Sequence, residues 1–212
     1  MAGVKNMMTL LLKLSRAIDV VSGWMGKLSL WMILITTFIS AGNALMRKFF
    51  SLSSNAWLEI QWYLFAAVFM LGAGYVFLCN AHVRIDFLSS RMSARTRNWI
   101  DIGGILIFLW PLCYLMITLS WPVVSNAYET GEMSSNAGGL IRWPVFALIP
   151  AGFVLLAAQA LSELIKRVAF LRGQGPDSLA HEELSDEEKL AMELMQADEA
   201  AAAAAQKAGV SK

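Results

Sequence analysis

Residues 60–81 read IQWYLFAAVFMLGAGYVFLCNA and contain no Asp, Glu, Lys or Arg. A helix rises about 1.5 Å per residue, so 22 residues extend over roughly 33 Å, and the hydrocarbon core of a bilayer is about 30 Å thick. This segment is therefore predicted to be a transmembrane helix.

Three further uncharged runs of 19, 26 and 20 residues lie on either side of it: Leu28–Met46, Ile102–Ala127 and Trp143–Ser162. The chain has 212 residues, of which 57% are hydrophobic and only 16% charged, and its mean hydropathy is +0.54. An ordinary soluble domain contains about 25% charged residues. The predicted fold class is an all-α membrane protein with four transmembrane helices, whose connections are too short for a soluble catalytic domain.

The basic residues predict the orientation of these helices. One side of the membrane would hold 11 bases and the other side 3, namely Arg47, Lys48 and Arg142. The richer side holds Lys5, Lys13, Arg16, Lys27, Arg84, Arg91, Arg95, Arg97, Lys166, Arg167 and Arg172. Because Lys and Arg are enriched in short cytoplasmic loops, both termini are expected in the cytoplasm.

The two ends of the chain differ from the membrane region 21–172. In residues 1–20, polar and apolar side chains recur on opposite helix faces, which predicts an amphipathic helix lying along the cytoplasmic interface. A plain extension of the first span is the alternative, and no signal-peptide cleavage site is expected. Residues 173–212 hold nine acids, three bases and an Ala-rich run, which predicts a cytoplasmic tail that is disordered or forms a short helix.

Two features within the spans bear on helix packing. Thr36, Ser40 and Ala44 recur at four-residue steps, and small residues at this spacing let membrane helices approach closely. Such residues are also frequent in any membrane helix, so ordinary composition explains them nearly as well. Pro111 lies inside the third span and predicts a kink.

Candidate catalytic groups are scarce, so we expect no enzyme activity, no cofactor and no metal site. The two His residues do not form a pair of axial haem ligands, and Cys79 and Cys113 lack a Cys-x-x-Cys partner. The bases lie at helix ends rather than in a patch, which argues against nucleic-acid binding. The span cores also lack the ionisable residues that mark ion paths, which favours a scaffold or accessory subunit.

Charged residues gather at both ends of the second span. Glu59 lies on the outer side, where it gains from the helix dipole and could reach Arg47 or Lys48. On the inner side, Arg84 and Asp86 could pair with each other, with lipid phosphate or with a neighbouring subunit, or belong to a generic basic loop. Trp99 and Trp143 are expected to be interfacial anchors.

Three motifs carry a resemblance to a known family: Ser54-Asn-Ala-Trp-Leu-Glu-Ile-Gln-Trp62, Leu71-Gly-Ala-Gly-Tyr75 and His82-Val-Arg-Ile-Asp86. Together, on a four-span chain, they resemble the small membrane subunit, a DctQ-like small permease, of tripartite ATP-independent periplasmic (TRAP) transporters. The resemblance covers roughly residues 19–171. Many members carry two adjacent acids where this chain has Leu58-Glu59, so a role that needs the pair does not transfer.

The resemblance implies a location in the bacterial inner membrane and a set of partners. A large multi-span membrane subunit would hold the substrate and sodium sites, and a periplasmic substrate-binding protein would deliver an organic acid anion. The small subunit would brace the large one and contact it, or membrane lipids, through residues of the motifs: Trp57, Glu59, Trp62, His82, Arg84 and Asp86. The alternative is a self-associating four-helix pore or assembly factor without a large partner.

Overall fold

The computed structural model describes residues 2–51, 54–80, 92–176 and 194–195, with side chains from residue 7 onward. The chain divides into two compact units, Met1–Asp177 and Ser178–Lys212. The second unit lies almost wholly outside the described residues, as do the predicted acidic tail and the inner motif with His82, Arg84 and Asp86.

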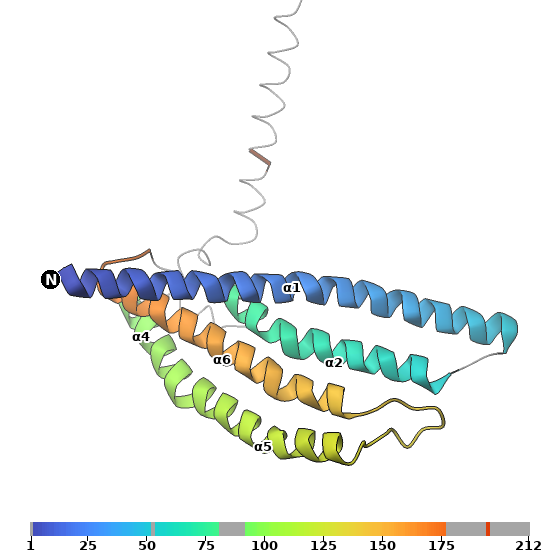
Figure 1. Cartoon of the computed structure of the whole chain (residues 1–212). Helices are drawn as coiled ribbons and strands as arrows, with labels where there is room; N and C mark the ends of the chain where they lie inside the picture. The colour runs from blue at the N-terminus through green and yellow to red at the C-terminus, as the bar shows by residue number, and fades with distance from the viewer. Residues whose placement is uncertain (1, 52–53, 81–91, 177–193, 196–212) are drawn as a thin grey trace, which may run out of the picture. The chain divides into compact units, whose positions relative to one another are not determined.

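The first unit is built of long helices (Figure 1). They are α1 (Ala2–Phe50), α2 (Asn55–Leu78), α4 (Ala94–Gly104), the π-helical turn η1 (Ile105–Leu109), α5 (Trp110–Glu129) and α6 (Trp143–Leu171). Four helical stretches are long and apolar enough to cross a membrane: Met7–Phe50, Asn55–Leu78, Ala94–Glu129 and Trp143–Leu171. The predicted fold class is confirmed.

Helix α1 is one uninterrupted helix of 49 residues, about 74 Å long at 1.5 Å per residue. It contains no Pro, so nothing in its sequence forces a break between the amphipathic residues 2–20 and the first span. The predicted amphipathic segment is therefore continuous with the span in this structure. Its placement along the membrane interface stays a prediction.

One face of α1 forms the contact seam with its neighbours. Its buried polar positions are Ser15, Ser22, Ser29 and Thr36, spaced seven residues apart, and Met8 begins the series. This heptad period is the one that keeps a helix face against its partner in a left-handed supercoil. Of the predicted four-residue series, Thr36 is buried in this seam, whereas Ser40 and Ala44 are exposed on this helix, so their close approach to another helix stays a prediction.

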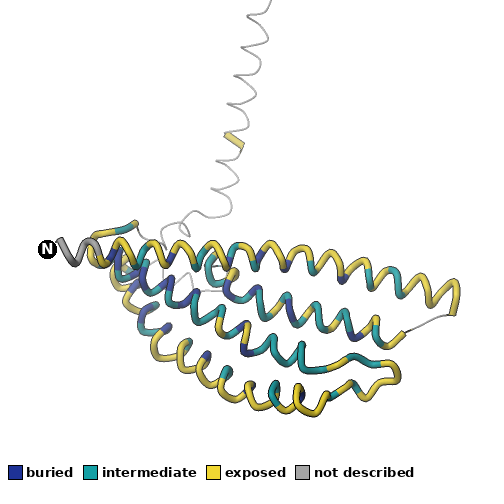
Figure 2. Tube along the Cα trace, viewed as in Figure 1, coloured by how far each residue is buried: buried dark blue, intermediate teal, exposed yellow. Residues whose placement is uncertain are grey.

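The helices pack in the order α1, α2, α6, α5 (Figure 1), and α1 also touches α6. Small residues allow close approach between the central pair: a Cβ placed on Gly152 of α6 would lie 2.7 Å from the Met70 carbonyl oxygen of α2. Gly72 and Gly74 are likewise buried where α2 meets its neighbours. Figure 2 shows long exposed faces along α1 and α5, the first and last helices in this order. These faces carry large apolar side chains, as expected of helices that meet lipid or another membrane protein.

The predicted kink at Pro111 takes the form of a π-helical turn, η1. The Trp110 N–H donates to the Ile105 carbonyl, five residues back, immediately before the proline that has no N–H of its own. A single widened turn accommodates the missing hydrogen bond while the helix continues through the bilayer. Helices α4 and α5 therefore form one span of 36 residues, Ala94–Glu129.

Candidate functional site

Two clusters of polar side chains lie at opposite ends of the helices. We call the cluster around Glu59 the outer latch and the cluster around Arg167 the inner ionic cluster, after the sides of the membrane that the basic residues predict for them. Each joins segments that are far apart in the sequence, and each places a carboxylate that is almost completely buried among hydrogen-bond donors.

The outer latch holds the hairpin loop that connects α5 to α6. Within this loop, Met133 and Ile141 form an antiparallel bridge, and the Ser134 N–H donates to the Leu140 carbonyl at 2.9 Å. An ion pair between Arg142 and Glu132, 3.0 Å apart, closes its base. Gly131 and Gly138 take positive φ angles of 62° and 71°, which let the chain turn without strain. The loop therefore has a defined conformation of its own.

The carboxylate of Glu59 is the centre of the latch and is only 3% exposed. Its Oε2 accepts from the Leu140 N–H at 2.7 Å, and its Oε1 accepts from the Asn136 amide at 2.7 Å and from the Ser134 hydroxyl. Hydrogen bonds to an ionised group are worth about 1.5–3 kcal/mol each, more than neutral ones. The predicted pairing of Glu59 with Arg47 or Lys48 is not formed, since the loop supplies its partners.

Two more residues of α2 extend the latch along one helix face. The Asn55 amide donates to the Ala137 carbonyl at 3.1 Å, and the Tyr63 hydroxyl donates to the Ile141 carbonyl at 3.1 Å. Residues 55, 59 and 63 follow at four-residue steps, so their side chains share one face of the helix. This stripe fixes the outer loop to α2 over two helical turns.

The inner ionic cluster joins α1, α4 and α6. The Arg167 guanidinium, 1% exposed, lies 2.6 Å from the Glu163 carboxylate and 3.1 Å from Asp101 of α4. Lys166 pairs with Glu163 on its own helix and, at 3.3 Å, with Asp19 of α1. A buried charge is tolerated only when such partners replace its hydration, so the cluster fixes the relative positions of the three helices.

Neutral polar groups complete the inner cluster. Asp19 accepts from the Gln159 amide at 2.9 Å and from the Ser162 hydroxyl at 2.7 Å. Ser22 donates to the Gln159 carbonyl oxygen at 2.7 Å, and the hydroxyls of Ser15 and Ser162 lie 2.7 Å apart. Ser15 and Ser22 of the α1 seam are therefore hydrogen-bonded to α6, whereas Ser29 donates to the Met25 carbonyl of its own helix. Both arrangements satisfy polar groups that would otherwise be costly inside a membrane protein.

The two clusters use their charges internally. The carboxylates of Glu59 and Glu163 are buried, and their oxygens accept from groups of this chain, so neither is presented to a substrate. Within the described residues, no group of three or more His, Cys, Asp or Glu side chains is placed to hold a metal ion. The chemistry available at both sites is the positioning of helices and a loop.

The structure places the sequence-predicted site residues in different surroundings. Glu59 is buried in the latch, whereas Trp57 and Trp62, on either side of it in α2, have exposed rings. Trp99 is exposed on α4, and Trp143 packs edge-on against Tyr128 with ring centroids 5.5 Å apart. His82, Arg84 and Asp86 lie outside the described residues, so their contacts stay predictions.

A comparison with protein families decides the identity of the chain. Residues 32–170 match the family described as tripartite ATP-independent periplasmic transporters, DctQ component. The chain belongs to this family. No curated protein and no solved structure matches it. The resemblance inferred from the sequence motifs is confirmed, and the chain is a multi-pass small membrane subunit of the TRAP transporter type.

The DctQ-family match covers most of both clusters but not all. It includes Glu59 with its loop partners and the inner residues Asp101, Glu163 and Arg167. Asp19, Ser15 and Ser22 precede the matched range and complete the inner cluster from the first part of α1. The long N-terminal part of α1 is thus joined to the family domain by specific polar contacts.

Proposed function

We propose that this chain is the small permease subunit of a sodium-driven TRAP transporter. It braces the large membrane subunit during uptake of an organic acid anion, which a periplasmic binding protein delivers. The family match supports the assignment of the chain as a TRAP transporter component. The sodium coupling, the substrate class and the bracing role are our extension of that assignment. In this proposal both termini are cytoplasmic and the latched loop 130–142 faces the periplasm.

The bracing role is supported mainly by one observation: at both ends of the helices, charged side chains bind partners within this chain. The outer latch ties the α5–α6 loop to α2, and the inner ionic cluster ties α1 and α4 to α6. A subunit that stays fixed while another part moves needs helices that keep their relative positions. Contacts at both ends of the helices supply that rigidity. Helices joined by buried ion pairs resist separation, because each buried charge would lose its partner.

The exposed apolar faces support a large membrane partner. Side chains such as Trp31, Phe38, Phe69 and Trp121 are 61–77% exposed and lie on three different helices. Lipid covers such faces in a bilayer, and a partner helix can replace lipid on one of them. We assign Trp57 and Trp62, and the inner motif with Arg84, to contacts with the large subunit or with lipid.

Co-purification tests this function. The tagged chain, expressed with the large subunit encoded beside its gene, should bring that subunit through purification in mild detergent. Arg84→Lys should weaken this association more than Arg91→Lys, because Lys keeps the charge but loses the planar fork that a bidentate contact uses. Equal yields with both variants would remove Arg84 from the interface. Recovery of the chain only with copies of itself would favour the self-associating alternative.

A further inference from the structure

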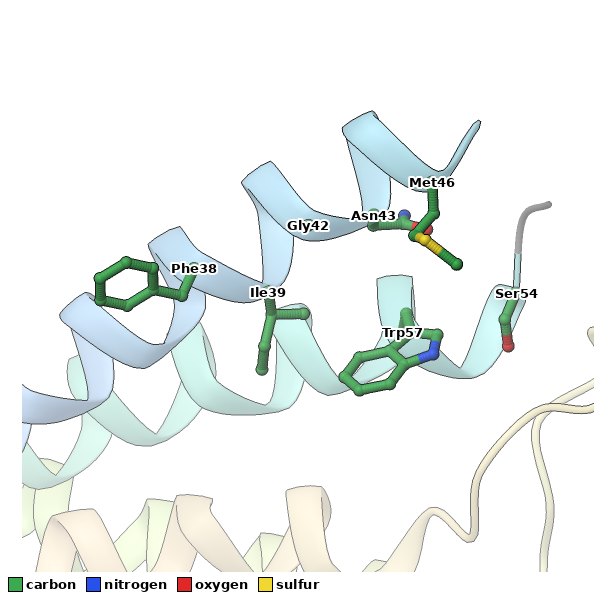
Figure 3. A pocket seen from close by; sticks show the side chains of 7 residues that line it. All are labelled: Phe38, Ile39, Gly42, Asn43, Met46, Ser54 and Trp57. Carbon is green, nitrogen blue, oxygen red and sulfur yellow. The ribbon is translucent and has the colours of Figure 1, made fainter. Parts of the chain in front are cut away.

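A groove of about 640 Å³ opens between the outer ends of α1 and α2 (Figure 3). Helix α1 lines it with Phe38, Ile39, Gly42, Asn43 and Met46, and α2 contributes the half-exposed Trp57 ring. The volume lies within the roughly 300–1,000 Å³ typical of ligand pockets. The outer latch and the inner ionic cluster do not line it, so their roles leave this groove unexplained.

The groove follows α1 over about two helical turns. Phe38 and Met46 are eight residues apart, about 12 Å along the helix axis. Because its lining is apolar except for Asn43 and Ser54, the occupant must be apolar over most of its length.

The charges beside the groove indicate the polar end of that occupant. Arg47 follows Asn43 by one helical turn, and Lys48 is adjacent to it, so both bases lie at the end of α1 next to the groove. Neither base forms an ion pair with an acid in the part of the chain that the structure describes, and Glu59 is engaged by the loop. Two bases beyond an apolar groove match an anionic group attached to a hydrocarbon chain.

We propose that the groove holds an acyl chain of an anionic phospholipid, with the phosphate beside Arg47 and Lys48. The hydrocarbon replaces water against Phe38, Ile39 and Trp57, while Asn43 and Ser54 contact the ester region. Gly42 leaves room for the chain, because a Cβ built there meets no atom within 4 Å. The bound lipid fills the space between two helices that this chain leaves apart.

The test uses the full chain reconstituted in phosphatidylcholine vesicles that contain a phosphatidylglycerol with a diazirine in its acyl chain. After illumination, peptide mass spectrometry should find adducts on residues 38–46 and on Trp57. Gly42→Leu places a side chain in the groove and should remove most of this labelling. Gly23→Leu is the matched control, since Gly23 is also in α1 with no atom within 4 Å of an added Cβ. Equal labelling of the two variants would overturn the proposal.

Two further measurements test the headgroup preference and the identity of the molecule in the groove. Each base should contribute about a fivefold preference for phosphatidylglycerol over phosphatidylcholine, so neutralising Arg47 and Lys48 by Gln should abolish the preference, whereas Lys27→Gln should keep it. An unchanged preference would overturn the headgroup assignment. In cell membranes, a benzoylphenylalanine at position 43 should crosslink to lipid, and a protein adduct in its place would show that a partner occupies the groove.

Discussion

Glu59 illustrates how one residue can serve a different role from the one its position suggests. At the first turns of a span, an acid is usually explained by the helix dipole or by a nearby base. Here its three hydrogen bonds go to a loop about 80 residues later in the chain. The sequence identified Glu59 as important but not its partners, because the spacing of Asn55, Glu59 and Tyr63 reveals a shared face and not what that face meets.

The first prediction concerns the outer latch. Glu59→Gln should loosen the loop 130–142, because an amide accepts more weakly than a carboxylate and turns an N–H toward existing donors. A loss of about 2 kcal/mol would raise the open population of the loop roughly 30-fold. Hydrogen–deuterium exchange at the Leu140 and Ser134 amides measures this opening. Glu129→Gln, at an exposed position nearby, should leave both amides protected, and equal exchange in the two variants would contradict the latch.

The second prediction concerns the inner ionic cluster. Arg167→Gln removes the cation that Glu163 and Asp101 share, and the buried Glu163 then keeps only its pair with Lys166. Removal of one partner from a buried pair costs at most about 3–5 kcal/mol, and the remaining Lys166 pair lowers that cost. The melting temperature of the purified chain in detergent should fall clearly. Arg172→Gln, at the exposed end of α6, should change stability by no more than about 0.5 kcal/mol. Similar melting curves for the two variants would show that the inner ionic cluster does not stabilise the fold.

At the scale of elements, hydropathy predicted the helices but not which face of each helix packs against its neighbours. Each span is a local property of composition, so four were found from the sequence. The α1 seam depends on which helix meets which, and its serines at seven-residue steps look like ordinary membrane-helix residues until α6 supplies Ser162 and Gln159. Glu163 and Arg167 were placed beyond the end of the fourth span, although α6 continues to Leu171.

The third prediction concerns the contact between α2 and α6. Gly152→Val would place side-chain atoms against the Met70 backbone, so the helices must separate or the variant must strain, at a cost of about 1–3 kcal/mol. Thermal unfolding in detergent measures the loss. Gly103→Val is the control, because a Cβ there meets no atom within 4 Å. Equal destabilisation of both variants would show that helix propensity, rather than the close contact, sets the cost.

At the scale of the whole molecule, the count of basic residues predicts which ends of the helices face the cytoplasm. The described loop 130–142 should face the periplasm and the start of α4 the cytoplasm. In a Cys-free background, Ser135→Cys should react with an impermeant thiol reagent in intact cells, and Ser93→Cys should react only after lysis. Both positions are exposed, so burial does not decide the outcome. The opposite pattern would reverse the topology.

The proposed function requires that the chain act as a fixed part of a larger transporter, and uptake by reconstituted vesicles tests this requirement most directly. Proteoliposomes containing this chain, the large subunit and the binding protein should accumulate an organic acid anion when a sodium gradient is imposed. Vesicles that lack either membrane subunit should not. Sodium-driven uptake by this chain alone would contradict the account, as would full uptake by the large subunit and binding protein without it.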